Sequence, residues 1–153
     1  KRDQGLIIQK NNPLNISSLK DLKNPQIRYI NRQNGSGTRI LLDYLLEKED
    51  IRPQEINGYN REEYTHLAVA ASIKNGASDT GLGIYSSARA LNLDFIPITR
   101  EQYDLCILPQ LFSTVNLERL YTAILSDEFK DRIMAIGGYN LDSTGQIITS
   151  NNI

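Results

Sequence analysis

A polar loop with small side chains separates an apolar run from a helical pattern in residues 27–46, IRYINRQNGSGTRILLDYLL. The N-terminus of a helix has unpaired backbone N–H groups and a partial positive charge, so it attracts anions. Gly35 and Gly37 allow a close approach of the backbone, while Ser36 and Thr38 add hydroxyl donors. The pattern predicts an oxyanion-binding loop, although a glycine-rich turn with an ordinary helix cap has the same composition.

Sharper motifs are absent from this loop. A P-loop needs a lysine after its glycines, and the dinucleotide fingerprint needs a third glycine beyond Gly35 and Gly37. Ser36 is not in the G-x-S-x-G context of a nucleophile elbow. His66, the only histidine, suits a structural or ligand-contacting role better than that of a general base. It has no His or Cys partner at metal-ligand spacing, so neither catalysis nor a metal site is expected.

Composition narrows the function classes further. The 153 residues suit one domain, and a net charge of −1 from 17 basic and 18 acidic residues implies no nucleic-acid-binding surface. No segment approaches membrane-spanning length. The single cysteine, Cys106, cannot form an internal disulfide and is expected to pack as a buried strand residue in LCILP. No targeting signal is found and a cytoplasmic location is expected, although the start without methionine, KRDQGLII, indicates a fragment.

Strand and helix patterns alternate along the chain. This order predicts an α/β domain with a largely parallel sheet, at whose carboxyl edge the helices starting near Ser36, Thr65 and Tyr85 converge. The predicted strands are 5–9, 26–30, 78–84, 93–98 and 103–108. The predicted helices are 17–22, 36–48, 66–74 and 85–92, followed by two helices capped by Asn116 and Ser126.

Four segments together resemble a known family: GLIIQKNNP, INRQNGSGTRILLDYLL, EEYTHLAVAASIKNGASDTGLGIYSSARAL, and YDLCILP with the later GGY. They resemble the periplasmic-binding-protein-like domain of MoeA-type molybdopterin-biosynthesis proteins and LysR-type molybdate-related regulators. The likeness covers residues 3–145. It implies a type II binding-protein fold, in which two α/β lobes close around a ligand.

The resemblance also implies how the chain is organised. Residues 1–153 form one fragment of such a domain. Residues 5–108 match the second lobe with its hinge strands, and residues 109–153 supply helices that return to a first lobe. That first lobe is incomplete in this chain. A second copy of the chain or a fused N-terminal domain is the partner that would cover its exposed surface.

The implied function is non-catalytic binding of a small oxyanion such as molybdate or tungstate, or of an anionic pterin-type ligand, in molybdenum cofactor biosynthesis or transport. The alternative is a ligand-sensing module of a transcriptional regulator that does not itself touch DNA. Related molybdate sites use neutral donors, and two arginines depart from that pattern toward phosphate or carboxylate. The expected ligand-binding residues are Arg32, Asn34, Gly35, Ser36, Gly37, Thr38, Arg39, Thr65, His66 and Tyr85.

Overall fold

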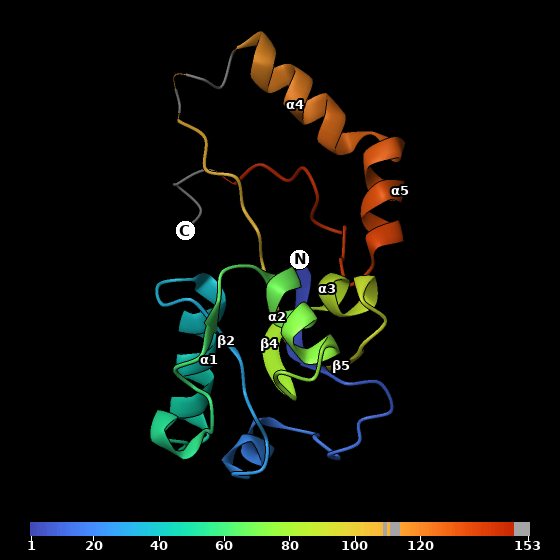
Figure 1. Ribbon diagram of the computed structural model, residues 1–153. Helices are drawn as coiled ribbons and strands as arrows, with labels where there is room; N and C mark the ends of the chain where they lie inside the picture. Colours follow the sequence, from blue (N-terminus) through green and yellow to red (C-terminus); the bar gives the residue numbers. More distant parts are fainter. Residues whose placement is uncertain (109, 111–113, 149–153) are drawn as a thin grey trace. The chain divides into compact units, whose positions relative to one another are not determined.

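Figure 1 shows a computed structural model of the chain, which describes residues 1–108, 110 and 114–148. The chain divides into two compact units. The first unit consists of Lys1–Arg2 and Glu101–Ile153, and the second consists of Asp3–Arg100. Both chain connections between the units run through strands, because the boundaries fall inside β1 (Arg2–Ile8) and β5 (Asp94–Glu101).

The main sheet has three strands in the order β4-β1-β5, with β4 at Thr80–Ile84. Strand β1 runs antiparallel to β4, with Gln4 opposite Ile84 and Ile8 opposite Thr80. Parallel pairing occurs between the short strands β2 (Asn31–Arg32) and β3 (Glu62–Glu63), and in a bridge from Tyr29 to Thr80. The predicted α/β fold class is confirmed, and the antiparallel β1–β4 pairing is a feature that the sequence did not predict. Strand direction depends on pairing between distant segments, which local residue patterns do not specify.

The helices of the second unit begin where the sequence predicts. Helix α1 spans Gly37–Lys48 and α2 spans His66–Lys74, with Ser36 and Thr65 as their N-caps. Helix α3 spans Tyr85–Ala90 directly after β4. Two short 3-10 helices occupy Leu19–Lys23 and Pro53–Glu55, the second between the predicted helices 36–48 and 66–74. The predicted strand 26–30 is reduced to the Tyr29 bridge before β2.

The core of the second unit lies on both faces of β1. Leu6 and Ile8 belong to one buried cluster, and Ile7 belongs to another, as the two-residue period of a strand requires. The first cluster includes Leu42 and Leu46 of α1. The second cluster contains Val69, Ala70 and Ile73 of α2. Burial on both sides explains why the strand is continuously apolar after Gln4.

The first unit contains α4 (Val115–Leu125) and α5 (Asp127–Ile136), neither of which has a buried residue. Ser126 caps α5 as predicted, and Gly137 ends that helix with φ 83°. The cap of α4 is Thr114 rather than the predicted Asn116. The two separate chain segments of this unit are joined by an antiparallel bridge between Arg2 and Tyr139. The expected helical segment 109–153 also includes residues 109, 111–113 and 149–153, which lie outside the described residues.

Two expectations about residues 103–108 are wrong. The segment forms no strand with any other described residue, and Cys106 is exposed rather than buried. An apolar run predicts burial, but burial requires chain that covers it, and the described residues do not cover this segment. Within the described part of the chain, no helix has the length and apolar character needed to cross a membrane.

Candidate functional site

One end of the main sheet brings the starts of three helices together. Gln4 lies opposite Ile84, the residue that precedes α3. The side chain of Gln4 reaches α1, because its Nε2 donates to Thr38 Oγ1 at 3.2 Å. The neighbouring Gly83 faces α2, and a Cβ placed there would lie 3.6 Å from His66 Nδ1. The sequence therefore predicted the convergence of these helix N-termini, and the sheet register explains how it arises.

The loop before α1 is open and rich in donors. Gly35 has φ +80°, a conformation that favours glycine. Apart from their chain neighbours and the backbone of α1, no described residue comes within 4 Å of the Cβ positions of Gly35 and Gly37. Ser36 Oγ accepts from the Arg39 N–H at 3.2 Å. The N–H groups of Gly37 and Thr38 have no partner among residues that the structure describes. This arrangement can receive an anion in front of the first turn of α1.

The starts of α2 and α3 contribute further polar groups. Thr65 is exposed and its Oγ1 accepts from the Ala68 N–H at 3.0 Å, while His66 is half-buried. Tyr85 is 36% exposed, and its ring meets Phe95 edge-on with centroids 5.4 Å apart. The exposed Asn34 completes the set that the sequence predicts around this end of the sheet.

Arg32 connects the segments that precede α1 and α2. Its Nη2 donates to the Tyr64 carbonyl at 2.9 Å, and its Nε donates to Gln33 Oε1 at 3.1 Å. Tyr64 stands directly before the Thr65 cap, and Gln33 stands near the start of the glycine loop. Arg32 is only 9% exposed. Its guanidinium therefore connects the segment that precedes α1 to the segment that precedes α2.

Arg39 is held inside the second unit rather than presented at the loop. Its Nη1 donates to Glu62 Oε1 at 3.2 Å, and its Nε lies 3.4 Å from Asp43 Oδ1. The guanidinium carbon lies 4.0 Å from the ring centroid of Tyr59. Burial alone would lower the pKa of Arg39, but the contacts with Tyr59, Asp43 and Glu62 raise it above its ordinary value. These contacts give Arg39 a structural role, and its contact with a ligand stays a prediction.

Gln4 was missed by sequence reasoning. It is fully buried in the same strand as the core residues, yet its side chain contacts Thr38 at the start of α1. The available signal was a glutamine directly before an apolar run, residues 5–8, that is buried on both faces. Such a residue needs a specific partner, because buried polar groups without hydrogen bonds are costly.

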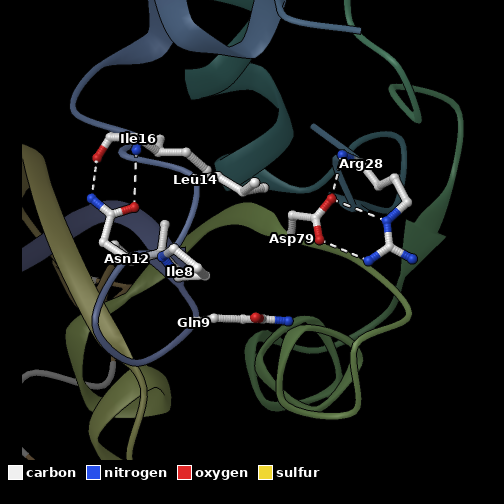
Figure 2. Close-up of a pocket in the computed structure, with 8 residues that line it drawn as sticks. Ile8, Gln9, Asn12, Leu14, Ile16, Arg28 and Asp79 are labelled. Atoms are coloured by element: carbon white, nitrogen blue, oxygen red, sulfur yellow. Dashed lines mark hydrogen bonds and ion pairs between the residues drawn. The ribbon is translucent and has the colours of Figure 1, made fainter. Parts of the chain in front are cut away.

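A separate cavity of about 180 Å³ lies near the opposite end of β1, where Ile8 pairs with Thr80. Figure 2 shows Asp79 bonded to Arg28 on one side of this cavity. Arg28 donates to the Asp79 carboxylate through its backbone N–H, Nε and Nη2 at 2.7 to 3.0 Å. These contacts join the segment before β2 to the segment before β4, which is a structural role.

The Asp79 contact makes stability depend on pH. The hydrogen bond from Arg28 holds the pKa of Asp79 below its ordinary value of 3.8. The ionised carboxylate therefore stabilises the fold above that pH, and the contribution is lost as pH falls through the folded pKa. We expect Asp79→Asn to lower the free energy of unfolding by about 1 kcal/mol at neutral pH, a discounted figure because Arg28 is partly exposed.

Urea unfolding at a series of pH values checks this expectation. The difference in the free energy of unfolding between wild type and Asp79→Asn should shrink as the pH falls below 3.8. Asp127→Asn is the control for an exposed ion pair. Asp127 is 98% exposed, and its Oδ1 lies 3.8 Å from Lys130 Nζ. A difference for Asp79→Asn that stays constant across this range would contradict the assignment.

Comparison with known proteins identifies the class. The PBP superfamily domain matches residues 1–125. The chain therefore belongs to the PBP superfamily and has a periplasmic-binding-protein-like ligand-binding fold.

Two relatives share 37% identity with the chain. One is the uncharacterized protein YvgK of Bacillus subtilis (strain 168), matched over 147 residues that make up 96% of this chain and 47% of YvgK. The chain thus spans about half the length of that relative. The other is a protein from the 5′ region of a ferredoxin 2Fe-2S gene of Clostridium pasteurianum, matched over 111 residues, 72% of this chain and 98% of that protein.

Solved structures establish the fold. PEB3 with bound L-phospholactate has a TM-score of 0.59 at 15% identity over 89% of this chain and 64% of its own. A substrate-binding domain assigned to a molybdenum ABC transporter of Clostridium difficile has a TM-score of 0.52 at 16% identity, over 92% of this chain and 63% of its own. An ancestral arginine-binding protein bound to arginine has a TM-score of 0.54 at 17% identity, over 88% of this chain and 59% of its own. The finer resemblance to MoeA-type and LysR-type proteins stays a prediction.

Proposed function

We propose that this domain binds a small oxyanion without catalysing a reaction, with molybdate or tungstate as the first candidates and molybdenum cofactor biosynthesis or transport as the setting. One observation carries the proposal: the first turns of α1, α2 and α3 meet at one end of the main sheet. Helix N-termini present N–H groups and partial positive charge to the same small volume.

The glycine loop is the centre of the proposed site. The N–H groups of Gly37 and Thr38 face an anion, and the hydroxyls of Ser36 and Thr38 add donors. Open space at Gly35 and Gly37 allows the close approach that such contacts need. Asn34, Thr65, His66 and Tyr85 then surround the ligand from the neighbouring segments, in the manner of the contacts that the family resemblance implies.

The two arginines favour a simple oxyanion over a phosphorylated pterin. Arg39 is occupied by Glu62, Asp43 and Tyr59, and Arg32 donates to Tyr64 and Gln33. Both guanidinium groups are therefore engaged with protein partners, and a bidentate clamp on a ligand would compete with those contacts. Recognition then rests on neutral donors and helix dipoles, which suits an oxyanion held by many short hydrogen bonds.

Calorimetric titration of the protein with molybdate, tungstate, sulfate and phosphate tests the proposal. We expect micromolar or tighter binding of molybdate or tungstate. In Ser36→Ala and Thr38→Ala this affinity should fall at least about tenfold, since each removes a donor to a charged group. Ser36→Ala also removes an N-cap worth about 1 kcal/mol, so its folding must be checked by circular dichroism.

A failure to bind any of the four anions would overturn the oxyanion proposal. The next probes are then L-phospholactate and arginine, the ligands present in two of the structures with the same fold. Binding that is unchanged in both variants would instead show that the ligand lies away from the glycine loop.

A further inference from the structure

Gln4 occupies an unusual position between the sheet and the proposed site. It is 0% exposed, and its Nε2 donates to Thr38 Oγ1 at 3.2 Å. Its Oε1 is also buried and has no hydrogen-bond partner among the described residues. A buried amide oxygen without a partner is costlier to the fold than an apolar side chain of the same length. Folding alone therefore does not account for glutamine at this position.

The contact with Gln4 determines what the Thr38 hydroxyl can do. A hydroxyl group has one proton to donate and lone pairs to accept. Because Thr38 Oγ1 already accepts from the Gln4 amide, its own proton is left for a different partner. Within the part of the chain that the structure describes, no hydrogen bond from this hydroxyl to a protein acceptor is formed. The Thr38 hydroxyl is therefore available as a donor at the first turn of α1, beside the N–H groups of Gly37 and Thr38.

We propose that Gln4 is a positioning residue that presets the Thr38 hydroxyl as a hydrogen-bond donor to the bound anion. The inference rests on the proposed function, and it narrows the ligand to one whose oxygen accepts at this point. Gln4 itself need not touch the ligand. It acts through Thr38.

The test compares ligand affinity with stability in Gln4→Met, a substitution that removes the amide at nearly constant length. Molybdate is the probe, or whichever of the four anions binds the wild-type protein most tightly. We expect the affinity of Gln4→Met to fall about tenfold, since an unoriented hydroxyl is a poorer donor to a charged group. The free energy of unfolding should stay the same or rise. A purely structural glutamine predicts the opposite pattern, lower stability with unchanged affinity.

A double-mutant cycle with Thr38→Val separates the positioning role from a general effect. In the Thr38→Val background, Gln4→Met should cause no further loss of affinity. Gln4→Glu adds a pH readout: its carboxylate accepts from Thr38, so affinity should be low at neutral pH and recover as the carboxyl group is protonated. Gln9→Met is the matched control, because Gln9 follows β1 near its opposite end and contacts the Ile73 carbonyl.

The outcomes distinguish the two claims. If the wild-type protein binds none of the anions, the proposed function fails and this inference fails with it. If the wild-type protein binds and Gln4→Met binds equally well, only the inference is overturned. Additive losses in the cycle, or a Gln4→Met protein that does not fold, would assign Gln4 to the structure alone and also overturn it.

Discussion

Substitution of Gly37 by alanine is expected to lower anion affinity at least about tenfold while leaving the fold intact. Gly37 is the first residue of α1, and no described residue beyond its chain neighbours and the α1 backbone lies within 4 Å of the position that its Cβ would take. The added methyl group therefore meets no protein atom, and Gly→Ala at such a site changes stability by only about 0.4 to 1 kcal/mol, in the favourable direction. An anion held by the Gly37 and Thr38 N–H groups would meet the methyl group directly.

Calorimetry for affinity and urea unfolding for stability check this result together. Gly76→Ala is the matched control, since its Cβ position is equally open but its φ is +73° and it follows the end of α2. That variant should lose about 1 kcal/mol of stability, because alanine disfavours positive φ, with no change in affinity. Equal affinity in wild type and Gly37→Ala would rule out close approach of the ligand to this loop.

Substitution of Arg39 by methionine is expected to have the larger effect on stability. The Arg39 side chain is 9% exposed and contacts both Glu62 and Asp43, which are 35% and 46% exposed. It also lies over the Tyr59 ring. Loss of these contacts should lower the free energy of unfolding by about 2 kcal/mol, less than for a fully buried ion pair because both carboxylates keep access to water.

Urea unfolding of Arg39→Met beside Arg52→Met isolates the effect of burial. Arg52 pairs with Glu55 on the surface and is 79% exposed. Arg52→Met should therefore lower the free energy of unfolding by no more than about 0.5 kcal/mol. Anion affinity of the folded Arg39→Met protein should remain within about threefold of wild type, since a residue that only supports the loop makes no ligand contact. A loss of affinity as large as that of Gly37→Ala, without loss of stability, would restore Arg39 to the ligand site.

The local elements of this protein follow from the sequence by itself. The caps Ser36, Thr65 and Ser126 each accept from the N–H group three residues later. The residues that determine these helix starts therefore lie within one helical turn of each other. Strand β1 and the α/β alternation likewise appear in short stretches of residue pattern. The glycine loop could therefore be predicted as the candidate site, together with the helix starts that meet beside it.

Only the tertiary structure decided which side chains lie beside the candidate site and which strands form the sheet. Arg39 is adjacent to the loop in sequence, yet Glu62 and Tyr59 hold it in the interior. Gln4 is distant in sequence, yet the packing of α1 against the sheet brings it to Thr38. Residues 103–108 have the composition of a buried strand but form none with the described residues. Strand pairing and side-chain burial join segments far apart in the chain, so the physical information that determines them is not present in any local pattern.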